Sequence, residues 1–374
     1  MNVLRRLPLN RLLALCALVV VLGISATALA SAIGSGPVPP AKPLAQAIHD
    51  ALGEQGREQV QGVSARIQLT NHLLEGADLA TGGSSVASSP LLSGASGRLW
   101  ISKDGHARIE LQAERGDTEI LYDGHTLSLY DAATSTLYRY TPPAHESGSA
   151  ADSGASDYTP SASGSPHEVP TVAKIEEAIS HLGKHASVSG ATPTDVGGQP
   201  AYTVRVSPKE SGSLLGATEL SFDANNGAPL RAAIYSTGKS APVIELAATQ
   251  VSYGPVSDSV FAFTPPAGTK IEDIAPAAHD SADKTSHSAE KPKLTTHGKG
   301  ISTIAVLEGK SSSTGAGKED EPLAGLPQVS INGTNASELR TELGTVLSFE
   351  RGGVRYVLAG AVAPSAIEEI ARGL

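Results

Sequence analysis

The sequence predicts an α+β protein in which a long antiparallel sheet curves over a few short helices, followed by a small C-terminal α+β module. Short segments of alternating apolar and polar residues follow one another with only tight turns between them, which is typical of an antiparallel meander. Apolar residues recur at helical spacing in only a few short stretches, so the helices are expected to cover the sheet and not to form the core themselves.

Length and composition narrow the class further. A chain of 374 residues favours two domains over one. The net charge of -10 argues against nucleic acid as a partner, because nucleic-acid binders carry a basic patch. Aromatic residues make up only 4% of the chain, so the core is expected to be aliphatic.

Residues 1–32 have the features of an export signal. Three arginines within the first eleven residues precede an uninterrupted apolar run, and small residues follow at the spacing of signal peptidase, with cleavage expected after Ala30 or Ala32. The alternative is an uncleaved membrane anchor, because residues 12–33 are long enough to span a bilayer. Cys16 lies inside the apolar run and not after it, which argues against lipidation. In both cases the protein is expected outside the cytoplasm.

The rest of the chain divides by composition. Residues 33–43 are a Pro/Gly linker, and 44–266 are expected to form the sheet domain. Within that domain, 141–170 lack apolar residues and are expected to be a disordered insert. Residues 267–300 are a second linker, and 301–374 are expected to form the small α+β module, closed by a C-terminal helix.

The expected elements of the sheet domain follow from these patterns. Two amphipathic helices are predicted, one from residue 44 to about 52 and one over 172–182 with Thr171 as its cap. A long polar interruption is expected over 73–96. The predicted strands and hairpins are 62–70, 97–103, 107–113, 119–131, 136–142, 201–207, 217–237, 241–254 and 261–266.

The hairpin over 119–131 carries the clearest local signal. Asp123-Gly124 is the dipeptide that tolerates the positive φ angles of a two-residue turn. With that turn, Tyr122 would lie opposite His125, and Ile120 opposite Leu127. Because side chains alternate across a strand, one face is expected to collect Ile120, Tyr122, Leu127 and Leu129.

A strongly curved sheet over small helices leaves a concave apolar space, which suits an apolar ligand. The alternative is a filled core, since the pattern alone does not distinguish a packed interior from a hollow one. The residues expected to line the cavity are Ile67, Leu99, Ile101, Ile109, Leu111, Ile120, Tyr122, Leu127, Leu129, Tyr202, Leu220, Phe222 and Ile234.

Motifs for catalysis are absent from the sequence. It contains no G-x-S-x-G elbow, H-E-x-x-H, phosphate-binding loop or dinucleotide fingerprint. His181 and His185 have the spacing of metal ligands, but no third ligand is near them. We therefore expect a protein that is not an enzyme and that needs neither a cofactor nor a metal.

The segment "GRLWISKDGHARIELQAERGDTEILYDGHTLSLYDAATSTLYRY" resembles the N-terminal meander of LolA-type lipoprotein carriers. It shares a G-x-L-W strand, a basic turn and an I-x-x-D-G-x-x-L-x-x-Y-D hairpin. That superfamily also includes extracytoplasmic lipid-binding lipoproteins of actinobacteria and the periplasmic sigma-factor regulators RseB and MucB. The resemblance covers about 44–266 and implies a half-open β-barrel, lidded by helices, whose apolar cavity accepts acyl chains.

The resemblance also implies partners and a gate. A basic residue that holds the lid shut would correspond to Lys103, with Arg108 as the alternative. The first hypothesis is a carrier that binds a lipid or an acylated lipoprotein at the cell membrane surface. The second is an envelope-stress sensor that binds a membrane-anchored anti-sigma factor, and the third is an envelope hydrolase, which the missing nucleophile motif argues against.

Overall fold

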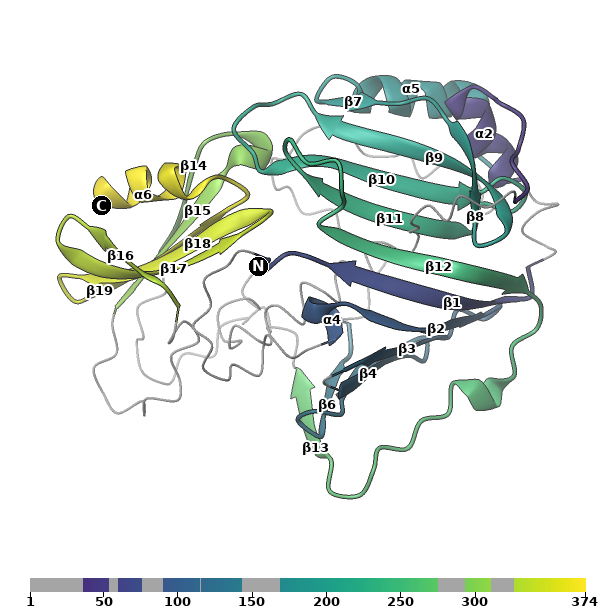
Figure 1. Cartoon of the computed structure of the whole chain (residues 1–374), viewed down its shortest axis with the longest axis horizontal. Coiled ribbons are helices and arrows are strands. Elements are labelled where there is room, and N and C mark those ends of the chain that lie inside the picture. Colours follow the sequence, from purple (N-terminus) through teal and green to yellow (C-terminus); the bar gives the residue numbers. More distant parts are fainter. Residues whose placement is uncertain are drawn as a thin grey trace, which may run out of the picture.

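In the computed structural model, the strands of the described residues form two open sheets (Figure 1). The structure describes residues 36–53, 60–75, 90–114, 116–142, 169–274, 293–310 and 326–374. The export signal expected over 1–32 and most of the insert expected over 141–170 lie outside these ranges. No helix in the described ranges is long and apolar enough to cross a membrane.

The larger sheet joins the two predicted meanders through one strand pair. Its spatial order is β13-β6-β5-β4-β3-β2-β1-β12-β11-β10-β9-β7, with β8 also paired to β9. The neighbours are antiparallel except β13 and β6, which are parallel. Its strands are β1 (Gly62–Asn71), β2 (Ala95–Ser102), β3 (Ala107–Ala113), β4 (Gly116–Tyr122), β5 (Leu127–Asp131), β6 (Thr136–Tyr140), β7 (Ala186–Val188), β8 (Thr192–Val196), β9 (Gln199–Pro208), β10 (Leu215–Asp223), β11 (Pro229–Ser236), β12 (Ile244–Tyr253) and β13 (Lys270–Ile274).

In the part of the chain that the structure describes, three short α-helices accompany this sheet. Helix α2 (Leu44–Ala51) packs its small residues against β9 and β10 and contacts α5 (Val172–Leu182). Thr171 caps α5 as expected, because its hydroxyl accepts a hydrogen bond from the Lys174 amide. Helix α4 (Pro90–Ser93) forms within the stretch expected to be a polar interruption, and its Leu91 is buried in the core.

The hairpin between β4 and β5 has the expected faces but a different register. Tyr122 pairs with Leu127, and the turn contains four residues instead of two. The Asp123 carboxylate explains the longer turn, because it accepts hydrogen bonds from the amides of His125 (2.9 Å) and Thr126 (2.6 Å). A shift of two residues leaves each side chain on its original face, so the apolar face survives this error.

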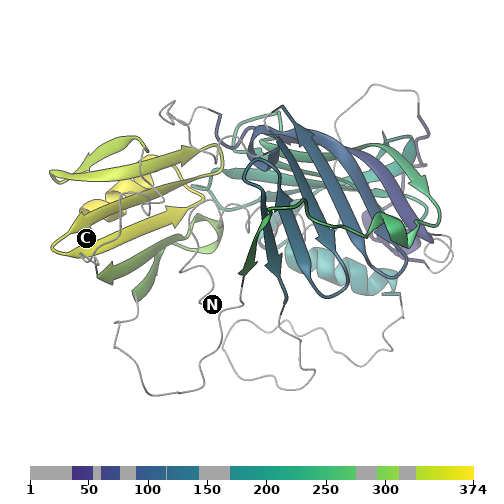
Figure 2. The same ribbon diagram turned by 90° about the horizontal axis from the view of Figure 1, so that it is seen from below.

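The stretch 261–266, expected to be a strand, belongs instead to a strap (residues 254–269) between β12 and β13. Figure 2 shows the strap crossing the strands of the first meander. It contains a short 3-10 helix, η3 (Asp258–Val260). Two aromatic contacts hold it, between Phe261 and His106 (5.7 Å between ring centroids) and between Phe263 and Tyr130 (5.6 Å). Residues 261–266 therefore bind the sheet through side chains, not as a strand.

The second sheet has the order β14-β15-β19-β18-β17-β16. Its strands are β14 (Lys293–His297), β15 (Ile304–Lys310), β16 (Gln328–Ile331), β17 (Thr334–Thr341), β18 (Gly344–Arg351) and β19 (Val354–Gly360). The short η4 (Gly300–Ser302) precedes β15, and α6 (Pro364–Arg372) buries Ile367 and Ala371 against this sheet. Both β13 and β14 lie in the range expected to be a linker, 267–300.

The two sheets meet at the ends of β1, β10 and β11. The amide of Leu214 and the hydroxyl of Ser213 both donate hydrogen bonds to the Ala361 carbonyl, at 2.8 Å and 3.0 Å. Lys239 pairs with Glu342 at 2.9 Å. The Glu342 amide also donates a hydrogen bond to the carbonyl of Leu73, just after β1, at 3.1 Å.

Candidate functional site

The side chains expected to line a cavity lie on one face of the large sheet. The strand register establishes this, because residues paired across antiparallel strands point to the same side. One row pairs Leu99, Ile109, Ile120 and Leu129 in turn, and Leu220 joins the same face through β11, β12 and β1. We call it the inner face, and it carries Ile67, Leu99, Ile101, Ile109, Leu111, Ile120, Tyr122, Leu127, Leu129, Tyr202, Leu220, Phe222 and Ile234.

The half of the inner face on β1–β5 is packed. Leu91 of α4 joins the same buried cluster as the strand residues, and Leu99 and Tyr122 pack against that cluster. Ile101 is half-buried. The expected cavity residues that are buried in this cluster are Ile67, Ile109, Leu111, Ile120, Leu127 and Leu129.

The other half of the inner face, on β9–β11, contains a groove of about 640 Å³. Helix α2 forms one wall, and the strands form the floor. Leu220 lies on that floor and is 41% exposed, although it is a large apolar side chain. Phe222 and Ile234 also line the groove, whereas Tyr202 is buried beneath α2.

Several groove residues were absent from the sequence-based set. They are Ile48 and Ala51 of α2, Leu52 directly after it, and Val206 and Ala232 of the strands. Val204, whose alternation with Tyr202 predicts the same inward face, lines the groove as well. The helix residues belong to the narrow apolar stripe of the first predicted helix, and the strand residues follow the alternation of Tyr202 and Ile234. Thr218, Glu219, Gly227 and Ala233 complete the lining, which is therefore mainly apolar.

A partly buried charge network lies on the opposite face of the sheet, which we call the outer face. Glu219 accepts hydrogen bonds from Arg205 (2.8 Å), Arg231 (2.5 Å) and the Tyr235 hydroxyl (2.7 Å). Arg231 also pairs with Glu245 at 2.8 Å, and Glu245 is only 3% exposed. These bonds link the neighbouring strands β9, β10, β11 and β12. Because β9–β11 form the floor of the groove, the network stabilises that floor.

The network also shifts the titration of its members. Burial raises the pKa of Glu219, but the hydrogen bonds from Tyr235, Arg231 and Arg205 outweigh burial, so its pKa lies below its ordinary value. Burial and the hydrogen bond to Glu219 raise the pKa of Tyr235. Burial lowers the pKa of Arg231, but its hydrogen bonds to Glu219 and Tyr235 outweigh burial and raise it, so Glu219 and Arg231 are ionised together at neutral pH.

The two basic gate candidates lie away from the groove. Arg108 is on the outer face, where it pairs with Glu110 (2.9 Å) and Glu119 and donates a hydrogen bond to the Val260 carbonyl of the strap (2.6 Å). Burial raises the pKa of Glu119 although Arg108 opposes this. Lys103 lies in the exposed turn between β2 and β3. In this structure Arg108 thus fastens the strap to the sheet.

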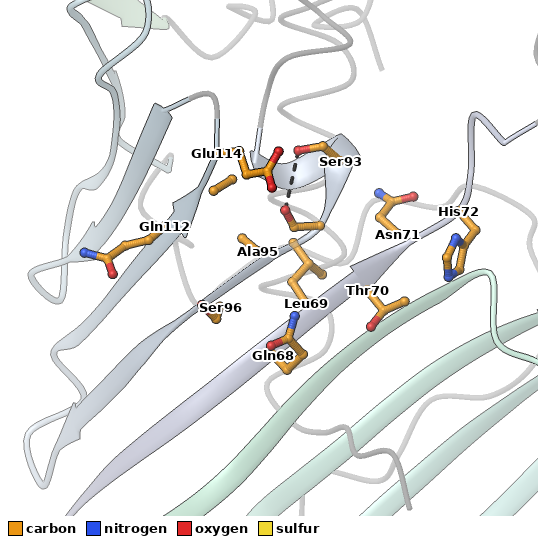
Figure 3. Close-up of a pocket in the computed structure, with 12 residues that line it drawn as sticks. Gln68, Leu69, Thr70, Asn71, His72, Ser93, Ala95, Ser96, Gln112 and Glu114 are labelled. Atoms are coloured by element: carbon orange, nitrogen blue, oxygen red, sulfur yellow. Dashed lines mark hydrogen bonds between the residues drawn. The ribbon is translucent and has the colours of Figure 1, made fainter.

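A second pocket, of about 570 Å³, lies beside α4 at the end of β1 (Figure 3). Its lining is more polar and includes Gln68, His72, Gln112 and Glu114. The Asn71 side chain donates a hydrogen bond to the Leu91 carbonyl at 2.7 Å, which fixes α4 to β1. Across the ranges that the structure describes, no three His, Cys, Asp or Glu side chains gather as a metal site.

Comparisons with known proteins return only distant likenesses. No protein-family model matches the sequence, and no curated protein matches it. The chain is similar to MucB in complex with MucA(peri), at 14% identity and a TM-score of 0.42, covering 87% of this chain and 97% of that one.

Two further solved structures are similar at lower scores. The MucA/MucB complex of Pseudomonas aeruginosa gives a TM-score of 0.38 at 14% identity, covering 88% of this chain and 94% of that one. A LolA superfamily protein from Nitrosomonas europaea gives 0.20 at 8% identity, covering 85% of this chain and 91% of that one. Both groups named from the hairpin motif are thus among the structures that this chain is similar to.

Proposed function

We propose that this protein is an exported, non-enzymatic carrier that holds the acyl chain of a lipid or of a lipoprotein in the groove between α2 and β9–β11. The observation that carries the proposal is the exposure of Leu220 on the floor of a mainly apolar groove. Each methylene that leaves water contributes about 0.8 kcal/mol, so about six buried methylenes supply about 5 kcal/mol without any polar contact.

The covering helices suit a lid. Helix α2 has only eight residues, and α5 buries Ile175 alone among its side chains and leaves Leu182 44% exposed. The buried side chains of α2 are all alanines, namely Ala45, Ala47 and Ala51, so these helices bury little apolar side-chain area of their own. Their displacement therefore costs less than opening the packed half of the inner face. In this proposal residues 44–266 act as a half-open barrel whose helices move aside to admit the chain.

The proposal also concerns location. A carrier of this kind exchanges its cargo at the surface of a membrane, and residues 1–32 would deliver it there as a cleaved signal or as an anchor. The module over 301–374 would then be an addition to the carrier unit.

The test is a titration with a fluorescent fatty acid, comparing the wild type with Leu220→Asp. We expect saturable binding by the wild type and its loss in the variant, because a carboxylate on the groove floor would have to be desolvated by the chain. Leu294→Asp is the matched control, since Leu294 is 50% exposed in β14, outside the groove. Equal binding by all three proteins would contradict the proposal.

The second candidate is a sensor that binds a membrane-anchored anti-sigma factor. It is favoured by the open edges of both sheets: among the described strands, β13, β7 and β8 lie at the edges of one sheet, and β14 and β16 lie at the edges of the other. Such edges accept an extended segment of a partner as an additional strand. The test is hydrogen exchange of these five strands with purified extracytoplasmic segments of single-span membrane proteins encoded beside a sigma-factor gene. Protection of an edge strand would support this role, and unchanged exchange would exclude strand addition.

A further inference from the structure

A small hollow of about 210 Å³ lies on the outer face of β12, β1 and β2, on the opposite side of the sheet from the groove. Two arginines, Arg66 and Arg98, line it from directly paired positions on neighbouring strands. Trp100, the single tryptophan of the chain, lines it as well. The hollow therefore combines two cations with one aromatic ring.

The two neighbouring arginines repel each other, which destabilises the sheet. Side chains directly opposite each other on antiparallel strands have their Cβ atoms about 5 Å apart, and like charges there are destabilising. Glu110 lies opposite Arg98 on the other side, but its carboxylate pairs with Arg108. Within the described ranges, neither Arg66 nor Arg98 has an ion pair, and both side chains are exposed.

The neighbouring groups favour an oxyanion as the missing partner. Arg66 is flanked on its other side by Gln250, and Ser64 and Ser252 add hydroxyl groups to the lining. Guanidinium groups bind phosphate through parallel N–H···O bonds, and hydroxyl and amide groups satisfy the remaining phosphate oxygens. A chain with a net charge of -10 does not attract anions over long distances. An anion must therefore be recognised through short-range contacts with Arg66 and Arg98.

We propose that Arg66 and Arg98 form a binding site for a phosphate group, with Trp100 beside it. The phosphate comes either from a soluble phosphate ester or from the headgroup of an anionic phospholipid. The phosphate site and Leu220 lie on opposite faces of the sheet. The fatty-acid titration therefore neither supports nor contradicts the phosphate site.

The tryptophan makes the test direct, because selective excitation reports on this hollow alone. Wild-type protein is titrated with inorganic phosphate at constant ionic strength, with chloride as the exchanged ion. We expect a saturable change in Trp100 emission. Arg66→Gln and Arg98→Gln should each weaken it by about tenfold or more, because each removes charged hydrogen bonds to the anion. Lys174→Gln, which removes one positive charge from exposed α5, should leave it unchanged.

Two further arms identify the source of the phosphate. Glycerol phosphate tests a soluble ester, and vesicles of phosphatidylglycerol, compared with vesicles of phosphatidylcholine, test a headgroup. A change in Trp100 emission with glycerol phosphate or with phosphatidylglycerol vesicles that is lost in both arginine variants supports the site. The probe that causes the change then identifies the source of the phosphate. No response to any probe, or a response that persists in both arginine variants, would overturn the proposal. Circular dichroism of the variants checks that their fold is intact.

Discussion

The two halves of the inner face have the same sequence pattern and different interiors. On β1–β5, aliphatic side chains and Leu91 of α4 fill the space, and Ile120 is only 3% exposed. On β9–β11, α2 covers the strands incompletely, and Leu220 remains 41% exposed beside a groove of about 640 Å³. Alternation of apolar residues thus determines which side chains share a face, but the covering helix determines whether that face is filled.

The largest expected effect separates the two halves by stability. Ile120→Ala should lower the free energy of unfolding by about 2–5 kcal/mol, because it opens a cavity in a packed cluster. Leu220→Ala should lower it by about 1 kcal/mol at most, because much of that side chain is already in water. Urea unfolding of both variants makes the comparison, and similar losses would show that the two halves are packed alike.

The charge network behind the groove should give an intermediate effect. Glu219→Gln should cost about 1–3 kcal/mol at neutral pH, because it weakens charged hydrogen bonds to Arg205 and Arg231. The pKa of Glu219 is lowered in the folded state, so its contribution is complete above the ordinary carboxyl pKa of 4.5 and is lost as the pH falls through the lowered value.

Stability measured against pH checks this sign. The wild type should lose stability more steeply below pH 4.5 than Glu219→Gln does. Parallel curves for the two proteins would mean that Glu219 is not held ionised by its partners.

The smallest expected effect concerns the turn of the packed half. Asp123→Ala should cost about 1 kcal/mol, because it removes the acceptor of the His125 and Thr126 amides. Asp104→Ala is the control, since Asp104 lies in the neighbouring turn and its carboxylate accepts no hydrogen bond from a described residue. If thermal unfolding shows equal losses of stability for Asp123→Ala and Asp104→Ala, the Asp123 carboxylate does not stabilise the turn.

Local periodicity was enough to predict the faces of the strands. It placed Ile120 and Leu220 on the same face although they lie far apart in the chain. The prediction of the faces remained correct although the predicted register of the hairpin was wrong by two residues. It did not predict the strap, because residues 261–266 alternate as a strand does but bind through Phe261 and Phe263. It also gave no sign of α4, a single turn whose place depends on contacts with distant strands.

The pairing of Arg66 with Arg98 shows a related limit. The two residues are separated by 31 intervening positions, 67 to 97, and only the register of β1 with β2 makes them neighbours. Composition suggested an acidic protein without a basic patch, and that average conceals two adjacent cations. Function that depends on pairs of residues across a sheet therefore needs the register, which the hydrophobic pattern alone does not supply.

The central claim is that the groove beside α2 holds an acyl chain, and native mass spectrometry tests it most directly. Full-length wild type and Leu220→Asp would be purified in parallel from lysate that contains membranes. The account predicts an added mass that matches an acyl lipid on the wild type and its loss in the variant. Wild-type protein that carries no lipid and takes up none when fatty acid is added would contradict it.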